Sequence, residues 1–445
     1  MRERLIALAQ ALKLPDVRRR LVFVMLMFAV YTFCAFVPLP GIDRAALSNF
    51  FRSQGGGLLG LFNAFSGGSL RRFSILALGI MPYINASIIF QLLAIAVPQI
   101  EELQKEGEYG RKKIAQWTKY LTVALAMLQA AGMLSMFASG AGVQMGIWGR
   151  LFAMVMMTSG TMFLMWLGEK ITDKGIGQGV SLIIFAGIVL ALPGYIRDTT
   201  NQYRAGDIGL QNVIFLALIF LAMVYGIVMV QQAQRKIPVQ YAKRVKGHRV
   251  YGGSSQFLPL RVNQAGVIPI IFAISVMLFP ATILQMLQAE KVASFLSQTL
   301  HLNPDIVSTI IFSVRKWSTP GQSTTASLLY FIMVVLFTYF YTAVTFNPEQ
   351  ISDDLRKNGG SIPGIRPGER TRDHLDRILM RITLAGAIFL GIVALTQYYV
   401  GDITGVTTFN LVGGTSLLIV VGVALDTMQQ VEAQLLMRRY RGFLD

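Results

Sequence analysis

Cysteine, histidine and charged residues are all scarce in this chain of 445 residues. A single cysteine, Cys34, excludes an internal disulfide, and three widely separated histidines add no recognisable metal-binding spacing. Only 14% of the residues are charged, whereas roughly 25% is usual for a soluble domain. Hydrophobic residues make up 53%. This composition excludes disordered and disulfide-scaffold classes and predicts a polytopic membrane protein.

Nucleotide-binding and catalytic motifs are also missing from the sequence. No P-loop is present, and the glycines of KGIGQGV (Gly175, Gly177 and Gly179) have the wrong spacing for a dinucleotide-binding turn. We interpret them as a flexible turn between two helices. We therefore predict a protein that is not an enzyme and has no cofactor or metal. Any nucleotide that drives it must be hydrolysed by a partner.

Uncharged apolar runs are what the sequence does contain. A bilayer core about 30 Å thick requires about 20 apolar residues per helix. The runs predict ten transmembrane helices in an all-α membrane protein, over 21–39, 73–97, 120–139, 151–168, 180–194, 211–230, 264–286, 326–346, 379–400 and 410–428. The fifth run is short, so either neighbouring helices shield it or its ends extend into the polar GIGQGV stretch that precedes it.

The net charge of +17 indicates the orientation of these spans. Of the 40 lysines and arginines, 30 fall on the side that holds both termini and 10 on the other. Because positive charge favours the cytoplasmic side, both termini are predicted to be cytoplasmic. None of the ten spans has an ionisable residue near its centre. That disfavours a secondary transporter with inverted repeats, which is the main alternative, because transporters bind ions near the midplane. An integral membrane enzyme would also need catalytic groups there.

The segment 55–72 (GGGLLGLFNAFSGGSLRR) is apolar but too short to span. Such a segment either lies as a loop in the outer interface or re-enters a cavity inside the protein. The span that follows contains Pro82, which we expect to kink its helix. In this span Ile80 and Ile84 share a helical face, a pattern that by itself indicates ordinary packing.

Seven blocks of the sequence, in order, resemble the bacterial SecY family of protein-translocation channels. They are PLPGID, FNAFSGGSLRRFSILALGIMPYINASII, GTMFLMWLGEKITDKGIGQGVSLIIFAGI, RKIPVQYAKR, LPLRVNQAGVIPIIFA, FNPEQISDDLRKNGGSIPGIRPGERT and GGTSLLIVVGVALD. They are distributed between residues 36 and 428. The resemblance implies a channel that passes unfolded polypeptides across the bacterial cytoplasmic membrane and releases transmembrane segments into lipid.

The resemblance also implies a domain organisation and a set of sites. Two pseudo-symmetric halves, 1–205 and 206–428, would surround a central pore, followed by a cytoplasmic tail, 429–445. A re-entrant plug helix at about 57–72 would include Leu58, Leu59, Leu61, Phe62, Asn63, Phe65 and Ser66. The hydrophobic pore ring would consist of Ile80, Ile84, Val180, Ile184, Ile271 and Ile419. Val180 stands where many members have isoleucine, which would loosen the seal slightly.

A lateral gate would open between spans 2, 3, 7 and 8. Our candidates for polar gate residues are Asn85, Gln129 and Asn263, although such residues also make ordinary helix-packing hydrogen bonds. The long cytoplasmic loops 231–263 and 347–381 are basic, which the positive-inside bias alone could explain. In the family they dock the ribosome, through RNA phosphates, and a SecA-like motor ATPase. We assign docking to Lys243, Arg244, Lys246, Arg249 and Arg366. SecE-like and SecG-like small membrane subunits are the other expected partners.

Overall fold

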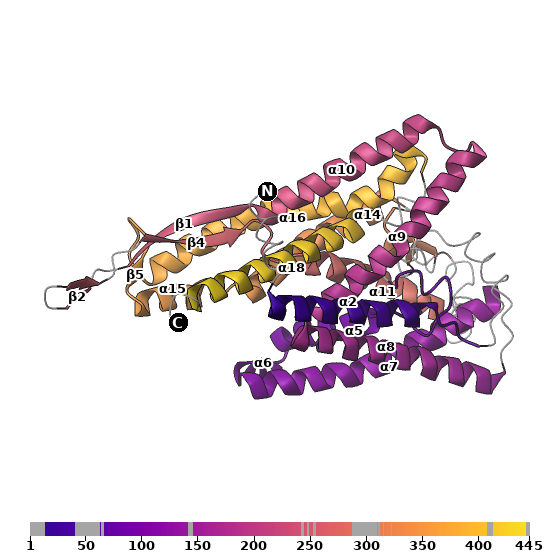
Figure 1. Cartoon of the computed structure of the whole chain (residues 1–445), viewed down its shortest axis with the longest axis horizontal. Coiled ribbons are helices and arrows are strands. Elements are labelled where there is room, and N and C mark those ends of the chain that lie inside the picture. Colours follow the sequence, from indigo (N-terminus) through magenta and orange to yellow (C-terminus); the bar gives the residue numbers. More distant parts are fainter. Residues whose placement is uncertain are drawn as a thin grey trace.

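The computed structural model describes residues 14–40, 63, 66–140, 146–241, 244–246, 249–251, 255–286, 309, 312–314, 316–321, 323–406 and 413–441. Within them, long helices form a bundle, and a small β-sheet extends from one end (Figure 1). A helix lies at each of the ten predicted spans. These helices are α2 (Pro15–Phe36), α5 (Met81–Ala96), α7 (Glu108–Gly140), α8 (Ile147–Lys174), α9 (Gly179–Ala205), α10 (Leu210–Gln232), α11 (Ile268–Met286), α14 (Thr324–Thr345), α16 (Glu369–Thr404) and α18 (Gly414–Arg441).

Seven helices among the described residues are long and apolar enough to cross a membrane, and the bent pair of α5 and α6 (Pro98–Lys105) raises the number to eight. The chain turns by 105° between α5 and α6, so part of the predicted loop 98–119 is helical. Of the other predicted spans, α7 packs on α5, α8 and α11, and α11 packs on α7, α14 and α16. The ten predicted spans therefore form one connected bundle.

The limits of several helices differ from those of the predicted spans, and the differences in the second and fifth spans bear on the site. The second span begins at Met81 rather than at residue 73, and Pro82 lies in its first turn, where a missing N–H costs nothing. Proline therefore starts this helix instead of kinking it. The fifth span extends mainly past its predicted C-terminal end, from Gly179 to Ala205 with Pro193 inside. Of the GIGQGV stretch, Gly179 and Val180 lie in the helix, whereas residues 175–178 precede it and Gly177 adopts a φ of +98°.

The basic loop 231–263 contains strands that the sequence analysis did not predict. Strands β1 (Gln234–Tyr241) and β4 (Ser255–Arg261) pair antiparallel, with Ile237 opposite Leu258. Two short strands, β2 (Arg244–Lys246) and β3 (Arg249–Tyr251), pair beyond them, away from the helices (Figure 1). The second predicted loop contributes α15 (Pro348–Lys357) and β5 (Gly360–Ser361), which pairs with β1. Both basic loops are thus joined through the pairing of β5 with β1.

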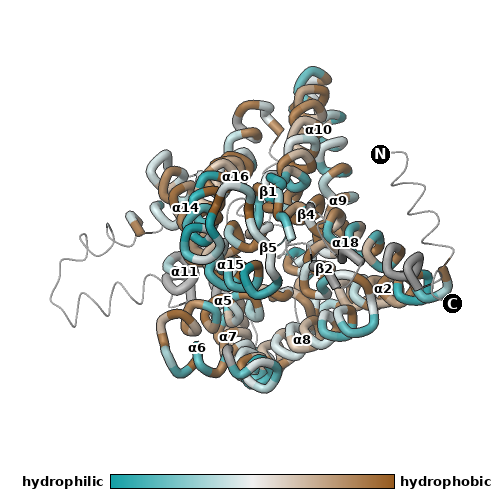
Figure 2. Tube along the Cα trace, turned by 90° about the vertical axis from the view of Figure 1, so that its left-hand side faces the viewer, coloured by the Kyte–Doolittle hydropathy of each residue, from teal (hydrophilic) through white to brown (hydrophobic). Residues whose placement is uncertain are grey.

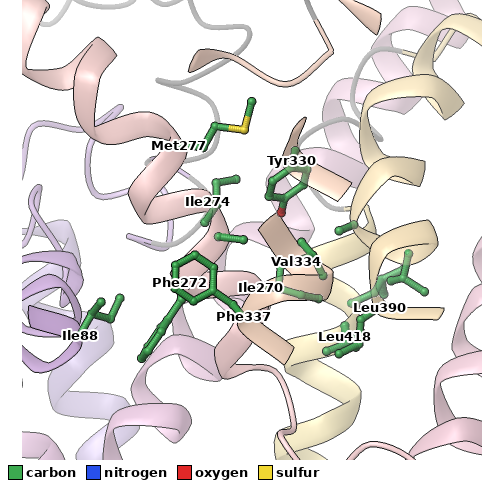
Figure 3. Close-up of a cluster of buried hydrophobic side chains, with 14 of the residues drawn as sticks. Ile88, Ile270, Phe272, Ile274, Met277, Tyr330, Val334, Phe337, Leu390 and Leu418 are labelled. Atoms are coloured by element: carbon green, nitrogen blue, oxygen red, sulfur yellow. The ribbon is translucent and has the colours of Figure 1, made fainter. Parts of the chain in front are cut away.

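Apolar side chains join these elements in separate clusters. Around α11 and α14, a buried cluster includes Phe272, Tyr330 and Phe337 (Figure 3). A second cluster connects α2, α5, α8, α9 and α18. Figure 2 shows hydrophobic residues along the helices, and large hydrophobic side chains such as Leu221 of α10 and Ile392 of α16 are exposed, as a surrounding bilayer requires.

Candidate functional site

One large apolar cluster joins α2, α5, α8, α9, α11 and α18. All six residues assigned to the pore ring belong to one hydrophobic cluster, which also includes Val24 and Leu182. Three of the six are buried, with exposed fractions of 3% for Ile80, 5% for Ile184 and 2% for Ile419. The partly buried members packed against them are Ile84, Val180 and Ile271. Aliphatic groups bind neither water nor ions, so such a cluster is an obstacle to both.

The chain positions Ile80 through non-helical backbone that α8 supports. Gly79 has a φ of +59°, and its carbonyl oxygen accepts a hydrogen bond of 3.1 Å from Thr161 Oγ1. A side chain on Gly160 would overlap the carbonyl of Ile75, so α8 packs directly on this backbone. Ile84 N then donates to Ile80 O at 3.1 Å, which begins α5. The two isoleucines thus keep the spacing of one helical turn.

A glycine places the α9 members of the cluster. Any side chain on Gly179 would overlap the carbonyl oxygen of Gly168 in α8, so only glycine permits this contact. Gly179 N donates to Thr172 Oγ1 at 2.9 Å. Val180 and Ile184 follow in the first turns of α9. The glycines of KGIGQGV therefore form a tightly packed corner, not a flexible turn.

Of the seven residues assigned to the plug, only Asn63 and Ser66 are among the described residues. Leu58, Leu59, Leu61, Phe62 and Phe65 lie outside them. Asn63 Oδ1 accepts from Arg71 N at 2.9 Å, and Ser66 Oγ accepts from Leu70 N at 3.2 Å. Both side chains are buried, with 9% and 3% exposed. These hydrogen bonds close the turns that connect the plug region to the second span.

The same turns are held by α2 and α9. Tyr31 Oη in α2 donates to Ser66 O at 3.3 Å. Arg72 donates to Gly67 O at 3.2 Å, and its guanidinium lies 4.0 Å from the centroid of the Phe36 ring. Partial burial lowers the pKa of Arg72, and the neighbouring Arg71 lowers it further, whereas Tyr31 raises it. A cavity of about 470 Å³, lined by Asn63, Gly68, Arg71, Arg72, Leu190, Ala191, Gly194, Tyr195, Arg197 and Asp198, opens beside these turns.

The helices of the predicted lateral gate are in contact through apolar side chains. Ile88 of α5 lies in the cluster formed by Phe272 of α11 and Phe337 of α14 (Figure 3). Phe90 of α5 also lies 6.3 Å from Trp117 of α7, measured between ring centroids. We call the contact of Ile88 with the α11–α14 cluster the gate seam.

The three polar gate candidates lie apart from one another. Asn85 Oδ1 in α5 is buried and accepts no hydrogen bond from a described residue. Gln129 is half-buried in α7. Asn263 precedes α11, where its Nδ2 donates to Gly266 O at 3.0 Å. A side chain on Gly386 would clash with Val262 O, so the Asn263 turn packs on α16.

The docking candidates are distributed over both basic loops. The backbone of Arg244, Lys246 and Arg249 lies in the β2–β3 pair, where Lys246 is opposite Arg249; Lys243 is outside the described residues. Arg366 is exposed in the turn before α16, and its carbonyl accepts from Thr371 Oγ1 at 2.9 Å. The pairing of β5 with β1 joins the two loops, whereas β2 and β3 form a separate two-stranded sheet.

Several polar contacts were not foreseen by the sequence analysis. Arg71 and Asp198, 127 positions apart, form an ion pair, and Arg261 approaches Asp426 of α18 at 3.8 Å. Arg235 lies beside two arginines of α16. Sequence spacing gave no indication of pairs so far apart. No group of three or more metal-ligating side chains occurs among the described residues.

Together, the apolar helices and the central aliphatic cluster define a multi-pass helical membrane protein. A family model described as SecY matches residues 74–428. The chain is 43% identical over 436 residues to "Protein translocase subunit SecY" of Escherichia coli (strain K12), covering 97% of this chain and 94% of that protein. It is 44% identical over 442 residues to the subunit of the same name from Thermus thermophilus, covering 98% and 96%. The chain belongs to the SecY family.

Solved structures share the fold. "The structure of a protein conducting channel" matches with a TM-score of 0.63 and 18% identity, over 94% of this chain and 93% of that chain. "Sec61 in the Canine ribosome-channel complex from the endoplasmic reticulum" matches with a TM-score of 0.60 and 17% identity, over the same shares. The fold is therefore that of these channels, as the sequence resemblance implied.

Proposed function

We propose that this chain is a protein-conducting channel, which passes unfolded polypeptides across the bacterial cytoplasmic membrane and releases hydrophobic segments sideways into lipid. The observation that carries the proposal is the meeting of six aliphatic side chains from α5, α9, α11 and α18. An aliphatic ring blocks ions and water at rest. It also yields to a passing chain of any sequence, because it makes no specific hydrogen bonds.

Crosslinking tests this pore. A stalled secretory chain is presented to variants with single cysteines at Ile80, Ile184 and Ile271, in a background where Cys34 is serine. Adducts are expected at all three positions. The matched control is a cysteine at Leu221, which is 63% exposed on the outer side of α10 and should form none. Adducts at Leu221 alone, or at no position, would contradict the pore assignment.

The pore lies between two pseudo-symmetric halves, residues 1–205 and 206–428. The contacts between α9 and α18 support this arrangement as one seam between the halves. There, Gly177 N donates to Gln430 Oε1 at 2.8 Å. The gate seam at Ile88 is the opposite seam, and it opens to lipid. Asn85 supports this role, because its buried free oxygen can accept a new hydrogen bond when the helices separate.

Both termini and the sheet face the cytoplasm, where the chain binds its soluble partners. The β2–β3 pair meets RNA phosphates of the ribosome, and Arg366 engages a SecA-like motor ATPase. The exposure of Arg366 and the pairing of β5 with β1 support a shared docking surface. SecE-like and SecG-like subunits cover part of the membrane-facing surface. The chain itself is not an enzyme, and energy comes from these partners.

A further inference from the structure

One short part of α18, which runs from the helix bundle toward the sheet, contacts two structures that are far away in the sequence (Figure 1). Gln429 accepts a hydrogen bond from Arg261, the last residue of β4, across 168 positions. Gln430 accepts one from Gly177, in the corner before α9, across 253 positions. The same helix carries Ile419, a residue assigned to the pore ring, about 15 Å further along its axis. We call residues 426–430 the α18 junction.

One face of the α18 junction is bonded to the three-stranded sheet. Asp426 and Gln429 are three residues apart and so share this face. Arg261 Nη2 donates to Gln429 Oε1 at 2.8 Å, and Arg261 Nη1 lies 3.8 Å from Asp426 Oδ1. The position of Arg261 is fixed by the sheet itself, because its backbone is paired with Gln234 of β1. A movement of the sheet therefore acts directly on α18.

The adjacent face of the α18 junction holds the corner before α9. Thr427 and Gln430 share this face, which is rotated by about 100° from the first because each helical residue turns the chain by that angle. Gly177 N donates to Gln430 Oε1 at 2.8 Å. A Cβ on Gly177 would lie 3.3 Å from Thr427 Oγ1 and 2.8 Å from Leu182 Cδ1. Gly177 is thus enclosed between α18 and the first turns of α9.

The corner is connected in turn to two residues assigned to the pore ring. Val180 and Ile184 lie in the first turns of α9, three and seven residues after Gly177. Gly179 N donates to Thr172 Oγ1 at 2.9 Å, so the corner and the start of α9 are joined to α8 as well. Because close-packed segments transmit a displacement instead of absorbing it, a shift of Gly177 reaches both ring residues.

We propose that the α18 junction couples the three-stranded sheet to the pore ring, with Arg261 and Gln430 as the positioning residues on its two sides. Binding of a partner to the sheet moves Arg261, and α18 transmits this movement through Gln430 to Val180 and Ile184, which loosens the seal. The inference rests on the proposed function for the event that moves the sheet. The coupling itself is a property of the chain without partners, so it can be measured separately.

Hydrogen–deuterium exchange of the purified complex, followed by mass spectrometry, measures the coupling. Gln430→Met keeps the length of the side chain but removes the accepting oxygen, so residues 175–178 should exchange about 2- to 10-fold faster, as the loss of one hydrogen bond predicts. Gln430→Glu keeps that oxygen and should exchange like the wild type. The control is Gln434→Met, which makes the same replacement one turn further along α18 and should leave the corner unchanged.

The decisive variant is Arg261→Met, because Arg261 is bonded to α18 and not to the corner. It should nevertheless speed exchange at residues 175–178, and Gln429→Met, which breaks the same hydrogen bond from α18, should do so too. Adding Arg261→Met to Gln430→Met should cause no further increase, because the corner is already released. Residues 211–230 of α10 should remain protected in every variant, which excludes general unfolding. Unchanged corner exchange in both Arg261→Met and Gln429→Met would overturn the coupling.

Ion conductance in planar bilayers tests what the coupling does. Addition of a SecA-like motor ATPase should raise the conductance of the wild type, whereas Gln430→Met and Arg261→Met should bind the motor equally well and lose most of this increase. Gln430→Glu should recover it. A full increase in Gln430→Met would overturn the transmission to the ring. If the wild type itself gives no increase while its corner exchange responds to Arg261→Met, the proposed function fails and the coupling stands.

Discussion

Arg71 Nη1 and Asp198 Oδ2 lie 3.4 Å apart and connect the end of the predicted plug segment to the far part of α9. Arg71 also donates its backbone N–H to Asn63 Oδ1. Arg71 is thus bonded to Asn63 through its backbone and to Asp198 of α9 through its side chain. This link depends on the unpredicted extension of α9 beyond residue 194, because Asp198 lies on that extension.

The first prediction concerns this ion pair. Its side chains are 51% and 38% exposed, so it contributes at most about 1 kcal/mol. Replacing Asp198 with asparagine or Arg71 with glutamine should raise resting ion conductance in planar bilayers about two- to fivefold. The double variant should leak no more than either single variant, since both remove one interaction. Additive increases would show that the two residues act separately.

A second prediction isolates a tight contact at Gly67. This glycine has a φ of +67°, and a Cβ there would lie 2.7 Å from Tyr31 Oη and 3.0 Å from Gly187 Cα. Gly67→Ala should therefore lower the melting temperature and increase ion leak. The control is Gly206→Ala, which has a φ of +82° but no atom within 4 Å of the added Cβ. It incurs only the backbone strain of about 1 kcal/mol, so it should cause no leak. Equal ion leak through both variants would show that the close contact at Gly67 does not contribute to the seal.

The third prediction tests the aliphatic cluster as a seal. Ile419→Ser places a hydroxyl among the six aliphatic side chains, and ions should then pass the resting channel. Ile237→Ser is the matched control. Ile237 is similarly buried, at 4% exposed, but it packs in a separate cluster with Leu375 and Leu379 of α16. Both variants should lose about 2–4 kcal/mol of stability. Only Ile419→Ser should conduct, as measured by ion efflux from proteoliposomes. If Ile419→Ser conducts no more ions than Ile237→Ser, the aliphatic cluster stabilises the fold but does not seal a pore.

The fourth prediction concerns Arg366. Its side chain is exposed and its backbone carbonyl alone makes the local hydrogen bond, so Arg366→Glu should fold normally. Secretion driven by the motor ATPase should fall at least about tenfold, as expected when a charge-assisted contact of 1.5–3 kcal/mol is lost. Lys357→Glu, which reverses an exposed charge nearby on α15, should secrete normally. Undiminished secretion by Arg366→Glu would remove this residue from the docking surface.

The second span and the cytoplasmic loops show where prediction from the sequence failed. Apolar residues from 73 onward favoured a helix, yet the chain is non-helical up to Ile80 because Gly79 bonds to Thr161 and Ile75 packs on Gly160. Charge alone indicated that the loop 231–263 is cytoplasmic. Within this loop β1 pairs with β4 and β2 pairs with β3, and β1 also pairs with β5, about 120 residues away in sequence; charge gave no indication of any of these pairings.

By itself, the sequence predicted the order and approximate positions of the long apolar helices. The bilayer imposes a length of apolar chain that local composition satisfies directly. It also supported the family resemblance through seven ordered blocks. Only the tertiary structure decided which side chains meet. Six aliphatic residues from four helices form one cluster, and Arg235 joins Arg377 and Arg381 across nearly 150 positions. Such contacts arise from packing between distant segments, and no local pattern encodes them.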